Sequence, residues 1–324
     1  MVMYGEIVIG LLALVGGAEL VVRGGSRVAA RFGISPIVIG VTVVAIGTSA
    51  PELAIGVDAA LRGSGSLAVG NIAGTNVLNL LFILGLVALL RPVELRSQTL
   101  RLDLPMIVGA ALLLWLLAAD GRITRLDGGV LVLFGVLYTA LVVRLARRES
   151  AAVRAEFVGE YGAAKRQTGP VRHLVRDAAW LVIGIAVIVV GANWLVDGAT
   201  GIARTLGLSE AFIGLTVVAI GTSAPELATA IVATVRKEHD IAVGNLLGSS
   251  VYNILFILGV TALVPAGGIA VERPLVVIDI PVMVAAAIAC VPVFITGHRI
   301  RRIEGAAFVV AYLAYLAYLL IARS

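Results

Sequence analysis

Residues 40–54 read GVTVVAIGTSAPELA, and residues 214–228 repeat this stretch as GLTVVAIGTSAPELA, with one difference at the second position. Each copy places a glutamate, Glu52 or Glu226, in an apolar run long enough to lie in a lipid bilayer. A carboxylate at that depth is costly unless it faces a polar cavity and has a partner. We therefore expect the two glutamates to share a cation.

A helix break is predicted in both copies. Pro51 and Pro225 each remove a backbone donor and clash with the preceding turn, and Gly47 and Gly221 weaken the helix just before them. In lipid, a broken helix is tolerated only where its freed carbonyl groups line a cavity or meet a ligand. Carbonyl, hydroxyl and carboxylate oxygens at one level form an all-oxygen site, which suits hard cations such as Na⁺ and Ca²⁺.

A second repeated motif follows each first one: residues 70–79 read GNIAGTNVLN and residues 244–253 read GNLLGSSVYN. Thr75 and Asn79 are four residues apart, so they share one face of a helix, and Ser249 and Asn253 do the same. These side chains offer neutral oxygens beside the glutamates. An alternative stays open for the asparagines and glycines that begin each motif, because small and amide residues also hold membrane helices together.

The composition indicates a membrane protein. Of the 324 residues, 60% are hydrophobic and 14% are charged, whereas soluble domains are about 45–50% apolar. The formal charge of +5 comes from basic residues that lie between the apolar runs. Basic residues distributed in this way are typical of the loops that set membrane topology and do not favour a nucleic-acid-binding surface. The single cysteine, Cys290, excludes a disulfide framework and a metal–thiolate cluster.

Ten transmembrane helices are expected from apolar runs of about 20 residues, which makes the chain an all-α integral membrane protein. Helices one to five form a first repeat, 1–146, and helices six to ten form a second, 177–324, with a polar linker at 147–176. The expected spans are 5–24, 34–60, 67–90, 103–119, 126–146, 177–199, 208–235, 241–264, 275–296 and 303–322.

The two halves are copies in sequence. They align at a constant offset of 174 from Gly17 and Gly191 through Gly85 and Gly259, and the offset drifts to 177 further on. Because each half holds an odd number of spans, the second must enter the membrane from the opposite side. This is an inverted-topology repeat, in which substrate binds near the bilayer midplane where broken helices of both halves meet.

The distribution of basic residues predicts the orientation in a cell membrane. Nineteen of the 25 Lys and Arg residues fall in the loops after odd-numbered helices and six on the other side. Cytoplasmic loops carry the excess of Lys and Arg. We therefore expect the linker 147–176 to be cytoplasmic and both termini to be outside. Asp279 lies near a predicted helix end, so an interfacial position is expected for it.

The paired GTSAPE motifs, each followed by GNxxG, closely resemble the alpha repeats of the cation/calcium antiporter superfamily, specifically its sodium/calcium exchanger branch. The resemblance covers both halves. It implies ten helices with a central calcium site flanked by sodium sites and no cofactor. It also implies a site built from matching positions of both repeats, namely Glu52, Glu226, Thr48, Thr222, Ser49, Ser223, Asn79, Asn253, Thr75, Ser249, Ala45 and Ala219.

Within that set, the resemblance implies different roles. Glu52 and Glu226 are the expected calcium ligands, with the carbonyls of Thr48 and Thr222 and the amides of Asn79 and Asn253. The hydroxyls of Ser49, Ser223, Thr75 and Ser249, with the carbonyls of Ala45 and Ala219, are expected to serve Na⁺. Potassium-dependent relatives carry aspartate where Asn253 stands, so a potassium-independent exchange is expected. Thr75 replaces the usual serine.

The predicted function is electrogenic exchange of Na⁺ for Ca²⁺ by alternating access, with these ions and the lipid bilayer as the only expected partners. An antiporter that exchanges protons for Ca²⁺ or another divalent cation is the alternative, because glutamates also exchange protons. A cation channel is disfavoured by the inverted repeat with one central site. An enzyme is disfavoured because no His or Cys lies beside the glutamates.

Overall fold

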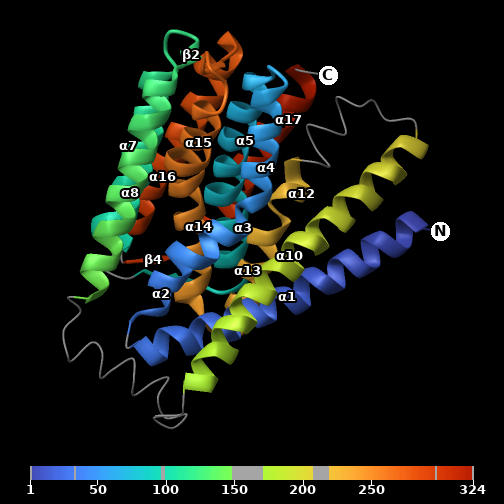
Figure 1. The fold of residues 1–324 in the computed structure, drawn as a ribbon, viewed down its shortest axis with the longest axis vertical. Coiled ribbons are helices and arrows are strands. Elements are labelled where there is room, and N and C mark those ends of the chain that lie inside the picture. The colour runs from blue at the N-terminus through green and yellow to red at the C-terminus, as the bar shows by residue number, and fades with distance from the viewer. Residues whose placement is uncertain are drawn as a thin grey trace.

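The computed structural model describes residues 2–32, 34–95, 99–147, 171–206, 219–295 and 298–322, and these are almost entirely helical. Broken helices alternate with continuous ones in the first half (Figure 1). The elements there are α1 (Val2–Phe32), α2 (Pro36–Ile39), α3 (Ala45–Thr48), α4 (Ala50–Leu61), α5 (Gly65–Val77), α6 (Leu84–Leu90), α7 (Leu104–Leu117) and α8 (Arg125–Arg147). Three π-helical turns join them: η1 (Gly40–Val44), η2 (Leu78–Ile83) and η3 (Thr99–Asp103).

The second half repeats this order. Its helices are α10 (Val171–Thr205), α12 (Ala219–Thr222), α13 (Ala224–Val235), α14 (His239–Tyr252), α15 (Gly259–Leu263), α16 (Ile280–Ile295) and α17 (Arg302–Ala322), with π-helical turns η5 (Asn253–Leu258) and η6 (Leu275–Asp279). Most of the expected linker lies outside the described residues, between Arg147 and Val171.

Most expected spans coincide with helices that can cross a bilayer. Within the described ranges, seven helices are long and apolar enough, and an eighth span is the bent pair Pro36–Thr48 and Ala50–Leu61. The expected span 103–119 falls on the 14-residue helix α7, and the expected span 208–235 falls on α12 and α13 and on residues that are not described. The chain is thus a multi-pass helical membrane protein, and the count of ten spans stays a prediction.

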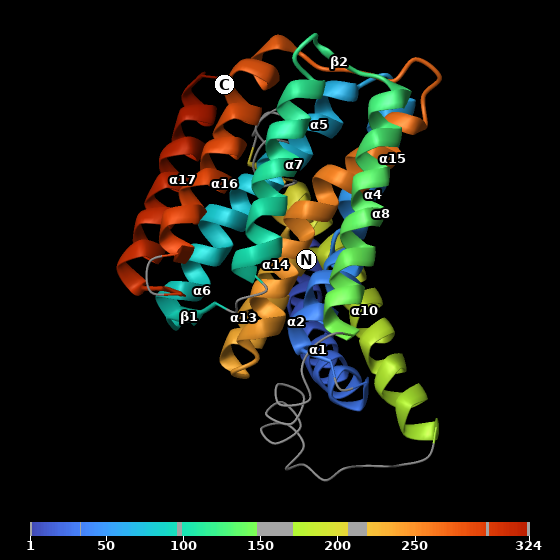
Figure 2. The same cartoon turned by 90° about the vertical axis from the view of Figure 1, so that its left-hand side faces the viewer.

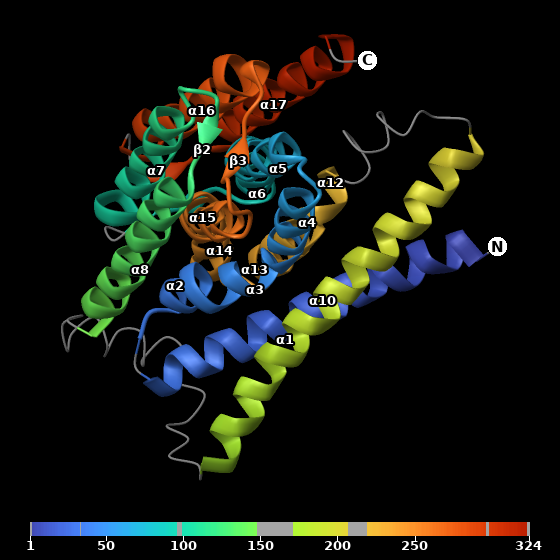
Figure 3. The same ribbon diagram turned by 45° about the horizontal axis from the view of Figure 1, so that its top comes forward.

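Helices α1 and α10 are longer than predicted and cross the rest of the bundle obliquely as an antiparallel pair (Figures 1 and 3). Glycines allow their close approach. A Cβ atom added to Gly17 would lie 2.8 Å from the Gly184 carbonyl oxygen, and one added to Gly10 would lie 2.7 Å from that of Gly191. These glycines recur every seven residues, so they share one face of each helix.

The centre of the bundle is formed by the helices that carry the second motif. The most apolar window of Gly65–Leu90 is 78% buried and that of His239–Leu263 is 83% buried, whereas that of Arg302–Ile321 is 17% buried. The broken helices α2–α4 and α12–α13 pack beside these two, and α8 and α17 lie on the outside (Figure 3). The residues of both repeated motifs therefore meet in the interior.

Two short antiparallel strand pairs lie at opposite ends of the bundle (Figure 2). Strand β1 (Val93–Glu94) pairs with β4 (Arg299–Ile300), and β2 (Arg122–Ile123) pairs with β3 (Ile269–Ala270). The apolar pattern gives no sign of these two-residue strands, so the all-α expectation holds apart from them. Each pair joins one half of the chain to the other.

Candidate cation-binding site

The helix breaks lie at Ser49 and Ser223, two residues before the prolines. Ser49 has φ −84° and ψ 13°, and Ser223 has φ −89° and ψ 6°, outside the helical range in ψ. The helix axis bends by 42° between Thr48 and Ala50. Glu52 and Glu226 consequently lie in the first turns of α4 and α13, where the partial positive charge of a helix N-terminus favours a carboxylate. The predicted breaks are confirmed.

Hydroxyl groups from both halves of the chain contact one carboxylate oxygen of Glu226. Its Oε1 accepts a hydrogen bond from Ser49 Oγ at 3.1 Å and lies 3.4 Å from Ser249 Oγ. Ser249 Oγ is also 3.4 Å from the Ala45 carbonyl oxygen. Thr48 Oγ1 lies 3.4 Å from that same carbonyl oxygen and 3.1 Å from Asn245 Oδ1. Residues of the first and second halves are thus in direct contact.

This cluster has more oxygen atoms than hydrogens to share between them. The five contacts among Glu226, Ser49, Ser249, Thr48 and the oxygens of Ala45 and Asn245 involve three hydroxyl groups, and each hydroxyl has a single hydrogen to donate. At most three of these five contacts can therefore be full hydrogen bonds donated by the hydroxyl groups. A cation relieves such a shortage, because carbonyl, hydroxyl and carboxylate oxygens are ligands for Na⁺ and Ca²⁺.

The side chains at the matching positions of the other repeat make fewer hydrogen bonds. Ser223 Oγ lies 3.5 Å from Thr75 Oγ1, and neither oxygen of Glu52 has a hydrogen-bond partner among the described residues. The side-chain amides of Asn79 and Asn253 likewise have none within that part of the chain. Buried polar groups are normally paired, so this group of orphaned oxygens points to a ligand.

Burial and charge are consistent with a shared site. Glu52 and Glu226 are both 0% exposed. Among the described residues, no group of three His, Cys, Asp or Glu side chains is placed to hold a metal ion. The charged ligands available here are therefore these two carboxylates.

The remaining predicted residues lie on the same elements. Asn79 is in η2 and Asn253 begins η5, so both amides stand on π-helical turns, which are frequent at functional sites. Thr222 is buried at the end of α12. Ala219 begins α12, and its side chain is outside the described part.

Sequence reasoning left one site residue open and did not find the hydrogen bonding of a buried carboxylate. Asn245 contacts Thr48 and belongs to the cluster, whereas Asn71 is half-buried and makes no such contact in the described part. Asp279, for which an interfacial position is expected, is 3% exposed within the protein and accepts a hydrogen bond from Tyr315 at 2.7 Å. The matching pair, Asp103 and Tyr138, is bonded at 2.9 Å, so the repeat offset is the signal that could have found both.

The chain matches a known family over both halves. The family model described as sodium/calcium exchanger protein matches residues 3–144 and 177–321. The chain is 40% identical over 269 residues to the inner membrane protein YrbG of Escherichia coli (strain K12), covering 81% of this chain and 80% of that protein. It is 30% identical over 341 residues to the sodium/calcium exchanger MaX1 of Methanosarcina acetivorans, covering 97% of each.

The fold also matches a solved structure. The sodium-calcium exchanger NCX_Mj, soaked with 2.5 mM Na⁺ and 0.1 mM Ca²⁺, superposes with a TM-score of 0.84 at 28% identity. The match covers 98% of this chain and 99% of that one. The similarity in sequence and in structure therefore extends over nearly the full length of the chain.

Proposed function

This chain belongs to the sodium/calcium exchanger protein family, and we propose that it is an antiporter that exchanges Na⁺ for Ca²⁺ by alternating access. The observation that carries the proposal is the buried pair Glu52 and Glu226 with surplus oxygens around it. Two carboxylates give a formal charge of −2, which one Ca²⁺ or two Na⁺ would neutralise. Competition of the two ions for the same oxygens would then couple their movements.

A stoichiometry of three Na⁺ for one Ca²⁺ would make the exchange electrogenic and would supply enough free energy to move Ca²⁺ against its gradient. Moving Ca²⁺ against a ten-thousandfold gradient requires about 5.5 kcal/mol. Three Na⁺ moving down a tenfold gradient release about 4.2 kcal/mol, and the one net charge adds about 2.3 kcal/mol per 100 mV. The sum exceeds the requirement. The neutral Asn253 supports exchange without K⁺, because a third carboxylate that would call for another cation is absent at that position.

The strand pairs support ten spans arranged as two inverted five-helix repeats, 1–146 and 177–324. Paired strands lie on one side of the membrane, so the chain between them crosses an even number of times. Between β2 and β3 lie α8, α10 and α14–α15, which are three candidate spans, so the segment that contains α13 supplies a fourth crossing. Between β1 and β4 lie the candidate spans α8, α10, α14–α15 and α16 and the crossing that contains α13. An even number of crossings then requires α7 to cross the membrane as well.

The same pairing, with the excess of Lys and Arg, supports the orientation. The β1–β4 pair belongs to loops on the basic side, which cytoplasmic loops favour. The linker 147–176 would then be cytoplasmic, and both termini would be outside.

Exchange of protons for Ca²⁺ or another divalent cation is the second candidate. The observation that favours it is Glu52, whose buried oxygens have no donor within the described residues. A proton can neutralise such a carboxylate as well as a cation can. No comparable observation among the described residues favours a channel or an enzyme.

Flux measurements in liposomes test the proposal. Vesicles loaded with Na⁺ and diluted into Na⁺-free medium with ⁴⁵Ca²⁺ are expected to take up Ca²⁺ with the pH equal on both sides, and without K⁺. Glu52→Gln and Glu226→Gln should each reduce uptake to the level of empty vesicles, because each removes one of the two site charges. Glu94→Gln, at an exposed strand position, is the matched control and should retain uptake.

Two results would contradict the assignment. Retained flux in either site variant would remove that glutamate from the site. Uptake that follows an imposed pH gradient but ignores the Na⁺ gradient would replace Na⁺ with H⁺ as the coupling ion.

A further inference from the structure

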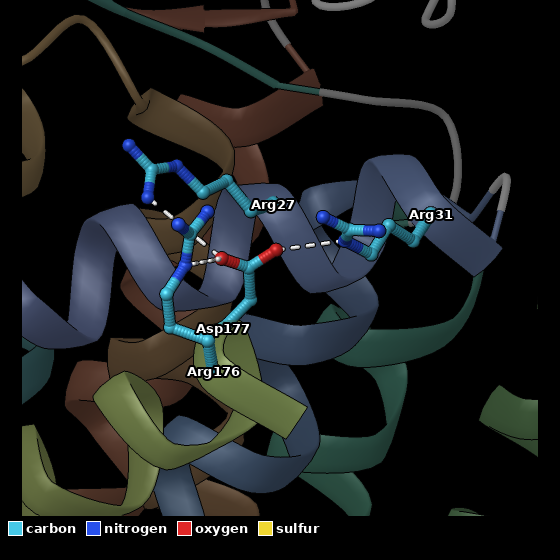
Figure 4. Close-up of polar contacts among 4 residues, drawn as sticks. All are labelled: Arg27, Arg31, Arg176 and Asp177. Atoms are coloured by element: carbon cyan, nitrogen blue, oxygen red, sulfur yellow. Dashed lines mark hydrogen bonds and ion pairs between the residues drawn. The ribbon is translucent and has the colours of Figure 1, made fainter. Parts of the chain in front are cut away.

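Three arginines surround one buried carboxylate where the end of α1 meets the start of α10 (Figure 4). Asp177 is 1% exposed, and its Oδ2 accepts a hydrogen bond from Arg31 Nε at 2.7 Å. Arg27 Nη1 and Arg176 Nε each lie 3.7 Å from Oδ1, on the other side of the carboxylate. Arg31 alone balances the charge of Asp177, so the cluster keeps a net charge of +2.

The two surplus arginines have donors to spare. A distance of 3.7 Å exceeds that of a hydrogen bond, and each guanidinium carries five N–H donors. Their side chains are 45% and 49% exposed. Within the described part of the chain, neither Arg27 nor Arg176 makes another polar contact. The cluster is therefore partly accessible and can accept an anion.

Trp180 contacts one of these arginines and indicates the depth of the cluster in the membrane. The guanidinium carbon of Arg27 lies 5.2 Å from the centre of the Trp180 ring, within the range of a cation–π contact. Tryptophan is enriched at the depth of lipid headgroups, which places the arginine cluster at the same depth.

An apolar surface continues from the cluster towards the bilayer. Arg176, Trp180 and Ile183 are spaced by four and three residues on α10, so they share one face of that helix. Ile183 is 52% exposed on a helix that is long and apolar enough to cross the membrane. A molecule with a phosphate at the arginines and acyl chains along this face would satisfy both parts of the surface.

The cluster is absent from the corresponding end of the other repeat. At the offset of 174 between the two repeats, Asp177 aligns with Met3, Arg27 with Gly201 and Arg31 with Thr205. The arginine cluster is therefore confined to one end of the α1–α10 pair and does not follow from the duplicated sequence.

We propose that Arg27 and Arg176, supported by Trp180, bind the phosphate of an anionic glycerophospholipid at this end of the α1–α10 pair. Basic pockets between transmembrane helices recognise such headgroups. The lipid is favoured over free phosphate because the exposed Ile183 face lies directly below the arginines. This proposal does not depend on which ions the protein carries.

Native mass spectrometry of the full chain in detergent tests the proposal with phosphatidylglycerol and phosphatidylcholine as probes. Wild-type protein should retain phosphatidylglycerol in preference to phosphatidylcholine. Arg27→Gln and Arg176→Gln should each weaken phosphatidylglycerol binding about five-fold. Arg62→Gln is the matched control, because Arg62 is bonded to Asp58 at 2.9 Å and leaves no surplus charge.

Further arms identify the ligand and exclude misfolding. Arg27→Lys keeps the charge and should keep most of the preference, and the melting temperature in phosphatidylcholine should be the same for all variants. Equal retention of the two lipids by the wild type, or unchanged retention in both Gln variants, would overturn the proposal. Displacement of phosphatidylglycerol by inorganic phosphate at an equal concentration would reassign the site to free phosphate.

Discussion

Asn253 decides the charge of the candidate site. It stands at the start of η5 with both amide atoms buried and without a partner in the described residues. Glu52 and Glu226 are buried and give a formal charge of −2 when both are ionised. A third carboxylate would raise the formal charge to −3, and a buried charge must be balanced by a counter-charge.

We expect Asn253→Asp to make Ca²⁺ flux depend on an additional monovalent cation. Uptake of ⁴⁵Ca²⁺ into liposomes should fall at least tenfold in choline chloride and recover in KCl, whereas wild-type uptake should be the same in both. Asn71→Asp, at a half-buried position outside the oxygen cluster, is the control and should show no K⁺ dependence. A variant that ignores K⁺ would place Asn253 away from the transported ions.

At the scale of single residues, the sequence predicts which side chains are buried together but not how they are bonded. The cost of burying either glutamate alone predicts that Glu52 and Glu226 share a site, and both are buried in the structure. The two copies of the motifs are similar in sequence, but their contacts differ. Ser49 and Ser249 both contact Glu226, whereas Ser223 contacts Thr75. That difference arises from how the two halves are arranged around each other.

The α1–α10 pair depends on its glycines at the scale of elements. Gly16 and Gly17 are neighbours on α1, but they face different surroundings. A Cβ added to Gly17 would meet the carbonyl oxygen of Gly184 at 2.8 Å and the backbone nitrogen of Ile188 at 2.9 Å, whereas one added to Gly16 would meet nothing within 4 Å.

We expect Gly17→Ala to destabilise the protein by about 1–3 kcal/mol, because the backbone of α10 must move away from the added carbon. Gly16→Ala should be neutral or stabilising by about 0.5–1 kcal/mol, because alanine favours the helix. Thermal unfolding of both variants in detergent measures the difference. Equal melting temperatures would show that the two helices are not packed this closely.

The elements themselves were predicted well where a local signal exists. Proline and glycine mark the breaks at Ser49 and Ser223, because their effects on the backbone are local. Helices α1 and α10 are longer than the predicted spans, since α1 continues past Arg27 and Arg31 and α10 begins before Asp177. Arg27 and Arg31 contact Asp177 across the two helices, and an apolar run does not reveal such contacts between distant segments.

Sidedness belongs to the whole molecule and can be read from the strand pairs. Cys290 is buried, so a Cys290→Ala background is suited to single-cysteine labelling. We expect Arg299→Cys and Glu94→Cys to react with a membrane-impermeant maleimide only from the cytoplasmic side. Arg122→Cys and Ala270→Cys should react only from outside, because β2 pairs with β3 at the opposite end. Paired strands that react from different sides would contradict the even number of crossings.

The strand pairs also set an order of events during synthesis. Glu94 has its partner in Arg299, so β1 cannot pair until 205 further residues have been translated, roughly 10–40 s at about 5–20 residues per second. The first half must therefore remain in the membrane as an unfinished intermediate whose loops have no partners. Quality-control proteases could act during this interval. A ribosome that stalls before Ile300 would leave a product in which the β1–β4 pair has not formed.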